Sequence, residues 1–187
     1  MSLSKKQSII LAFALSAMMW ITRGHHTASI ANLPDASWAI FFAVGFYFSG
    51  FAVIALFLAQ ALLIDYLVVT QLGVGESCFT IAYAFLLPAY LSLWFAGKWL
   101  SKHYALNIHS LRNFLVAAFS GTVVCELVSS GSYYAFNVPQ SASLSEFMVR
   151  FAQYLPNALA ITFSYLLVVL VAHLVVSAIS EKVALSN

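Results

Sequence analysis

The sequence predicts an all-α integral membrane protein that folds as a single domain over its 187 residues. It is 63% hydrophobic and only 7% charged, which is far less charge than the surface of a soluble domain carries. Its apolar stretches approach the roughly 20 residues that a helix needs to cross a bilayer. The net charge is only +2, so the chain lacks the basic surface that binds nucleic acid.

We expect six transmembrane helices, taken from the apolar stretches in chain order. They cover residues 7–22, 37–48, 50–71, 79–100, 113–130 and 155–179. No small-residue cleavage site follows the first stretch, so it is interpreted as a retained helix rather than a signal peptide. Ser49 and Gly50 separate the short second helix from the third, and the two can form a bent hairpin. In the competing five-span interpretation, residues 37–71 form one and a half helices.

The basic residues predict the orientation of these helices. Six of them fall on one side of the predicted membrane: Lys5, Lys6, Lys98, Lys102, Arg112 and Lys182. Because basic loops remain in the cytoplasm, we expect both termini there. The outer face then carries residues 23–36, 72–78 and 131–154. The last of these segments includes an amphipathic stretch at 144–154, with Ser143 or Ser145 as its N-cap.

Three polar side chains suggest a pocket near the outer face. Asp65 lies inside the third predicted helix, where a carboxylate costs about 2.5–3.5 kcal/mol and usually faces a cavity or a partner. A protonated Asp65 bonded to a neighbouring helix is the competing interpretation. We expect Arg150 to neutralise Asp65 or to contact a ligand, although it could also extend to the membrane interface. Tyr83, one turn into the fourth helix, is expected to hydrogen-bond into the same pocket.

The two cysteines differ in position. Cys78 opens the fourth predicted helix, where the helix N-terminus lowers the pKa of a thiol and favours the thiolate that binds metals. The competing interpretation is a small residue that packs without reacting. Cys125 is expected to pack in the core, with a disulfide to Cys78 as the alternative. Glu126 fits a cavity acid and an interhelical acid equally well.

The histidines fall into two groups. His25 and His26 follow the first helix on the outer side, and His26 is one of the candidate binding residues. The other three fall near the inner side: His103, His109 and His173. The sequence contains no Walker loop, so the chain has no ATP site of its own.

Several of these residues lie in segments that resemble a known family. Six short spans in fewer than 200 residues resemble the substrate-binding S-components of energy-coupling-factor (ECF) transporters. Four segments together resemble the BtuM family of small cobalamin transporters. They are Arg-Gly-His-His at 23–26, Leu-Ile-Asp-Tyr at 63–66, Gly-Glu-Ser-Cys-Phe-Thr-Ile-Ala-Tyr at 75–83 and Val-Arg-Phe at 149–151. The resemblance runs along the whole chain and is most specific around Cys78.

The resemblance implies uptake of cobalamin, or a related corrinoid, across the bacterial inner membrane. Cys78 would be the axial ligand to cobalt, and the cobalamin would bind base-off, with its own nucleotide base displaced. His26, Asp65, Tyr83 and Arg150 would line the pocket around the corrin ring. Thiolate is a strong donor to a transition metal. A thiolate on one face of cobalt also implies assisted removal of a cyanide from the other face, an enzymatic activity beside transport.

The resemblance implies the corrinoid and membrane lipid as partners, and it gives a weaker indication of a protein partner, the ECF coupling module. S-components carry an Ala-x-x-x-Ala patch on their first helix for the ECF coupling module, whereas this chain has Ala12 and Ser16 at that spacing. Small residues still allow close helix approach, so dependence on a coupling module stays open. Two functional alternatives also stay open. One is an S-component for another small vitamin, and the other is a membrane thiol–disulfide or quinone-linked oxidoreductase that uses Cys78 and Cys125.

Overall fold

The computed structural model describes residues 4–23, 33–72, 81–105, 107–138 and 143–186. Over these ranges the chain forms helices and no strand, which confirms the all-α prediction. The elements are α1 (Lys5–Arg23), α2 (Ser37–Tyr47), α3 (Phe51–Leu72), the 3-10 helix η2 (Ile81–Phe85), α4 (Leu86–Lys102), α5 (Ile108–Asn137) and α6 (Leu144–Ser186).

Four stretches of the described helices are long and apolar enough to cross a membrane. They are Phe51–Thr70, Ile81–Lys102, Ile108–Asn137 and Leu144–Val176. These four indicate a membrane protein. The second predicted span is present as the apolar helix α2, but its 11 residues cover only about 16 Å, roughly half of the hydrocarbon core.

The break between the second and third predicted helices is present. The backbone at Phe48, which follows α2, is extended, and α3 begins at Phe51. Residues 37–71 therefore form two helices, the first half as long as the second, which leaves both the six-span and the five-span interpretation open. The fourth predicted helix begins as η2 and continues as α4 without a gap.

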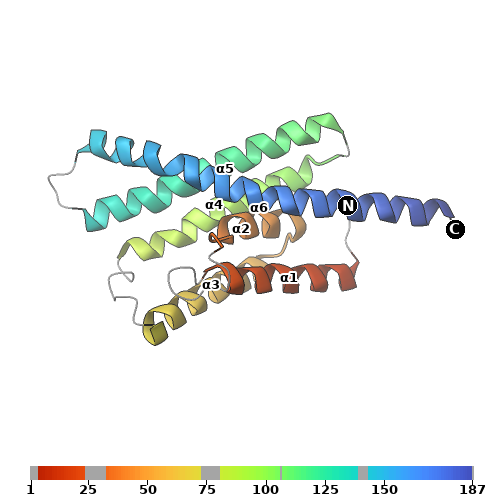
Figure 1. The fold of residues 1–187 in the computed structure, drawn as a ribbon, viewed down its shortest axis with the longest axis horizontal. Helices are drawn as coiled ribbons and strands as arrows, with labels where there is room; N and C mark the ends of the chain where they lie inside the picture. The colour runs from red at the N-terminus through yellow and green to blue at the C-terminus, as the bar shows by residue number, and fades with distance from the viewer. Residues whose placement is uncertain (1–3, 24–32, 73–80, 106, 139–142, 187) are drawn as a thin grey trace.

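Helix α2 forms the centre of the bundle, with α1 and α3 on one side and α5 and α6 on the other (Figure 1). Eight of its residues are buried, as expected for a helix that is apolar all round. Two glycines allow α2 and α4 to approach closely. A Cβ atom on Gly97 would lie 2.0 Å from the carbonyl oxygen of Phe42, and one on Gly45 would lie 2.0 Å from that of Trp94.

Most of the predicted outer segment at 131–154 is helical, which confirms the amphipathic stretch at 144–154 and extends the helix before it. Helix α5 continues to Asn137, and α6 begins at Leu144. Ser143 is the N-cap of α6, since its Oγ accepts a hydrogen bond of 3.2 Å from the backbone N–H of Glu146. The amphipathic stretch is therefore the first part of α6, which continues through Pro156.

Helix α1 begins and α6 ends at the same end of the bundle, where the connection between α4 and α5 also lies (Figure 1). We call this the basic end, because it carries Lys5, Lys6, Lys98, Lys102 and Arg112. Arg23, at the end of α1, and Arg150, in the first part of α6, lie at the opposite end. This distribution matches the grouping of charges that the sequence predicts.

Candidate functional site

The guanidinium of Arg23 connects helices α1, α2, α3 and α4 through hydrogen bonds, at the end of the bundle opposite the basic end. Arg23 is the last residue of α1 and is buried. Its Nε and Nη2 donate to the two carboxylate oxygens of Asp65 on α3, both at 2.7 Å. Its Nη1 donates to the Ser37 Oγ of α2 and the Tyr90 hydroxyl of α4, both at 2.8 Å. Such a two-pronged pair with a carboxylate is a strong and directional interaction.

Asp65 and Tyr83 lie in direct contact. The Tyr83 hydroxyl, on η2, donates a short hydrogen bond to Asp65 Oδ2. The Asp65 side chain is 20% exposed and has a charged partner in Arg23. Of the two expected surroundings, a cavity or a partner, Asp65 has the partner, and it lines neither of the two cavities described below. That partner, Arg23 on a neighbouring helix, was not expected from the sequence.

Asp35 extends this network to the start of α2. Its Oδ1 accepts from the backbone N–H of Ser37 at 2.9 Å and from the Ser37 hydroxyl at 2.6 Å. Its Oδ2 lies 3.6 Å from Arg23 Nη1. Thr22 Oγ1 accepts from the backbone N–H of Ala36 at 3.2 Å. The last turn of α1 therefore fixes both the first residue of α2 and the carboxylate beside it.

A cavity of about 700 Å³ begins at Asp35, and we call it the α5–α6 cavity. Its walls come from the start of α2, the second half of α5 and the first part of α6. It is lined by Pro34, Asp35, Trp38, Glu126, Ser129, Ser130, Tyr133, Tyr134, Val138, Phe147, Arg150, Phe151, Tyr154, Asn157, Ala158, Ile161 and Thr162. Aromatic faces and a few polar groups together are typical of sites for large, mostly apolar ligands.

Arg150 lines this cavity and does not neutralise Asp65, so the first of its two predicted roles is wrong and the second, contact with a ligand, stays a prediction. Its Nη2 donates to Glu146 Oε1 at 2.7 Å and its Nε at 3.2 Å, within α6. The side chains of Arg150 and Glu146 are 51% and 46% exposed. A half-exposed pair of this kind is weak, so Arg150 retains N–H groups that can reach a molecule in the cavity.

Glu126 and Cys125 are neighbours with different surroundings. Cys125 is fully buried and free, which confirms the prediction that it packs in the core. Glu126 lines the α5–α6 cavity and accepts a hydrogen bond from Ser130, one turn away on α5. Ser130 belongs to the same helix as Glu126, so of the two interpretations the cavity acid describes Glu126 better.

Cys78 and His26, the proposed cobalt ligand and its neighbour in the pocket, lie outside the described residues. Among the residues that the structure describes, no three His, Cys, Asp or Glu side chains are close enough to hold a metal ion. A cobalt site through Cys78 therefore remains a prediction. Of the five candidate residues, the structure describes Asp65 and Tyr83 in one hydrogen-bonded network and places Arg150 in the adjacent cavity.

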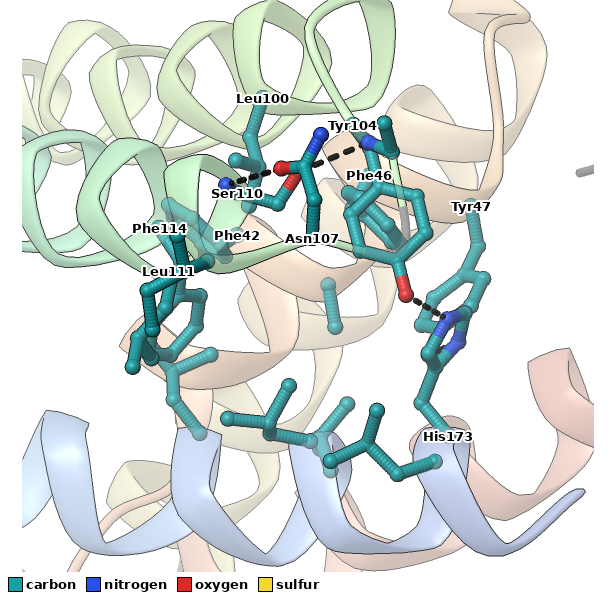
Figure 2. Close-up of a pocket in the computed structure, with 17 residues that line it drawn as sticks. Phe42, Phe46, Tyr47, Leu100, Tyr104, Asn107, Ser110, Leu111, Phe114 and His173 are labelled. Atoms are coloured by element: carbon teal, nitrogen blue, oxygen red, sulfur yellow. Dashed lines mark hydrogen bonds between the residues drawn. The ribbon is translucent and has the colours of Figure 1, made fainter. Parts of the chain in front are cut away.

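A second cavity, of about 360 Å³, lies at the basic end between α2, α4, α5 and α6. Its most polar feature is His173 of α6, which is hydrogen-bonded to Tyr47 and Tyr104 (Figure 2). The sequence analysis placed His173 on the inner side without assigning a role. An isolated histidine in an apolar helix was the signal, but its tyrosine partners lie 126 and 69 residues away along the chain.

No model of a known protein family matches this chain, and no curated protein matches it either. Support for a function therefore comes from the residues themselves and from the geometry around them.

Proposed function

We propose that this protein takes up cobalamin or a related corrinoid across the inner membrane of a bacterium. The observation that carries the proposal is the segment Gly-Glu-Ser-Cys-Phe-Thr-Ile-Ala-Tyr at 75–83, which resembles the BtuM family. Two residues of that resemblance, Asp65 and Tyr83, are hydrogen-bonded to each other. A third, Arg150, lines the α5–α6 cavity.

In this proposal the corrinoid lies against the α5–α6 cavity. The tyrosines and phenylalanines of its wall offer flat, apolar faces to the corrin ring, and Arg150 offers N–H donors to the carbonyl groups of its amide arms. Asp35 belongs both to the cavity wall and to the Arg23 network. Packing changes around a bound ligand would therefore be transmitted to α1 and α3.

Cys78 supplies the bond to the metal that the protein carries. Only two residues separate Cys78 from Ile81, the first residue of η2, so the chain connects the thiol to the end of the bundle where Tyr83 lies. A thiolate at cobalt displaces the nucleotide base of cobalamin, so the ligand binds base-off. His26 would complete the surroundings of the corrin ring.

The membrane topology is part of the proposal. In it, α1 and the short α2 cross the membrane beside the four long apolar stretches, so that the start of α1 and the end of α6 would lie on one side. The basic end carries most of the lysines and arginines, which favours its cytoplasmic location. The α5–α6 cavity then opens toward the outer face, where a corrinoid arrives.

The visible absorption spectrum of the bound corrinoid tests the cobalt–thiolate bond. Purified protein with cobalamin should show a spectrum shifted by sulfur ligation, and Cys78→Ala should lose that shift. Cys125→Ala is the matched control, because it removes the buried thiol and should leave the spectrum unchanged. Cobinamide, which lacks the nucleotide base, should give the same spectrum as cobalamin. An unchanged spectrum in Cys78→Ala would refute the ligation.

Cyanide release tests the accompanying chemistry. Thiolate donation to cobalt weakens the bond to a cyanide on the opposite face, and that cyanide leaves as the anion with its electron pair. Incubation of the protein with cyanocobalamin should release cyanide faster than incubation with Cys78→Ala. Equal release from both proteins would leave corrinoid binding intact and remove the enzymatic part of the proposal.

A further inference from the structure

The cavity at the basic end has a polar end and an apolar end. Figure 2 shows Tyr104, Tyr47 and His173 gathered on one side, with Phe42, Phe114 and Leu111 on the other. Phe46 packs edge-on against Tyr47, Tyr104 and His173, with ring centroids 4.8–5.7 Å apart. The cavity therefore presents a small hydrogen-bonding group surrounded by rings, followed by an aliphatic region.

The hydrogen bonds of His173 leave one donor unused. The Tyr47 hydroxyl lies 2.9 Å from Nδ1, and the Tyr104 hydroxyl lies 2.9 Å from Nε2. A neutral imidazole has one N–H donor and one acceptor nitrogen. One tyrosine therefore donates to the ring, while the other accepts from it and keeps its own O–H hydrogen. With either tautomer, one hydroxyl hydrogen of this pair remains available to a ligand.

The other polar groups of the lining, Asn107 and Ser110, lie beside the start of α5 and accept hydrogen bonds from the backbone. The side chain of Asn107 accepts from the backbone N–H of Ser110 at 3.0 Å and caps α5. The Ser110 hydroxyl accepts from the backbone N–H of Ala105 at 2.8 Å. An ordered water needs two to four polar partners. The end of the cavity formed by Tyr47, Tyr104 and His173 offers one free hydroxyl hydrogen among aromatic rings, so it suits an organic acceptor better than water.

The cavity is open toward the apolar surface of the helices. Its lining includes Ile108, Leu111 and Leu174, which are 74%, 45% and 46% exposed. On a membrane protein this surface is in contact with lipid. A molecule dissolved in the bilayer can therefore enter from the side, between the start of α5 and the last third of α6.

We propose that this cavity binds a membrane-soluble molecule that has a long apolar body and a carbonyl oxygen at one end. The carbonyl accepts the free hydroxyl hydrogen of Tyr47 or Tyr104, and the apolar body lies along Leu170 and Leu174. A carbonyl pairs with this hydrogen and brings no donor of its own that would be left unpaired. Two kinds of membrane molecule share this chemistry, the isoprenoid quinones and the ester-linked acyl lipids. The site is independent of the proposed corrinoid cavity.

Binding of a short-chain quinone and of a fatty-acid methyl ester to the full-length protein tests the proposal. Each probe is titrated separately against protein in detergent, and the probe that saturates at the lower concentration identifies the source. The double variant Tyr47→Phe/Tyr104→Phe should bind that probe with an affinity lower by about fivefold or more, because it removes the hydroxyl that donates to the carbonyl. Tyr66→Phe is the matched control, since Tyr66 is exposed on α3 and lines neither cavity.

A second pair of variants tests the cavity without changing its hydrogen bonds. Leu170→Trp fills the aliphatic region and should abolish binding, whereas Val168→Trp places the same side chain at a 66% exposed position on α6 and should not. If the wild-type protein binds neither probe tightly, the proposal is wrong. Equal binding by Leu170→Trp and Val168→Trp would overturn it as well, even if the tyrosine variants were unstable.

Discussion

Replacing Asp65 by asparagine tests whether the Arg23–Asp65 pair stabilises the end of the bundle opposite the basic end. In Asp65→Asn the guanidinium of Arg23 stays buried, with a side chain only 6% exposed. It keeps the neutral acceptors Ser37 and Tyr90 at 2.8 Å and Asp35 at 3.6 Å. Removing one partner of a buried ion pair costs about 3–5 kcal/mol.

The expected loss for this pair is somewhat smaller. Asp65 is 20% exposed, and Asp35 can move toward the unpaired guanidinium. We therefore expect a loss of about 2–3 kcal/mol in the free energy of unfolding. For a chain of 187 residues, this corresponds to a decrease of about 4–12 °C in Tm.

The assay is thermal unfolding of the detergent-purified protein, followed by loss of the monodisperse peak in size-exclusion chromatography. Glu146→Gln is the matched control, because it also removes a carboxylate from an arginine pair, here between half-exposed side chains. Its Tm should stay close to that of the wild type. Equal decreases in Tm for Asp65→Asn and Glu146→Gln would show that the buried Arg23–Asp65 pair contributes no more to stability than the half-exposed Arg150–Glu146 pair.

Two further predictions concern the core. Gly97→Ala should strongly reduce the yield of monodisperse protein, because its Cβ would lie 2.0 Å from the Phe42 carbonyl oxygen and separate α2 from α4. Gly50→Ala, which has no neighbouring atom within 4 Å, should purify like the wild type, and similar yields for both variants would contradict this account of the helix contact. In a Cys78→Ser variant, Cys125 should resist a maleimide reagent until the protein unfolds, as measured by mass spectrometry, since it is fully buried. Labelling of the folded variant would show that the core around Cys125 opens.

The positions of the helices were largely predictable. Length and apolarity located α3 to within one residue of its expected bounds, and Ser49 and Gly50 correctly marked its separation from α2. The start of α6 was predicted as an amphipathic stretch with Ser143 as its N-cap, and this is confirmed. Its continuation through Pro156 into the sixth predicted span was not predicted, because a proline commonly ends a helix. The extension of α5 to Asn137 was not predicted either.

The candidate site was predictable only residue by residue. The sequence identified Asp65 as a carboxylate that needs a partner, and Tyr83 as a side chain directed toward the same region. It gave the wrong cation, since Arg150 pairs with Glu146 while Arg23 holds Asp65 from 42 residues away. His173 was visible as an isolated polar residue, but the two tyrosines that make it part of a site were not.

The sequence by itself determined that this chain is helical and apolar, because helix formation depends on neighbouring residues and on the length of each apolar stretch. It also determined the grouping of basic residues at one end. Only the tertiary structure decided that Arg23 neutralises Asp65, that α2 is enclosed by the other helices, and that two cavities lie at opposite ends. Those features depend on which helices become neighbours, and that is set by packing between residues far apart in the chain, such as Gly97 against Phe42.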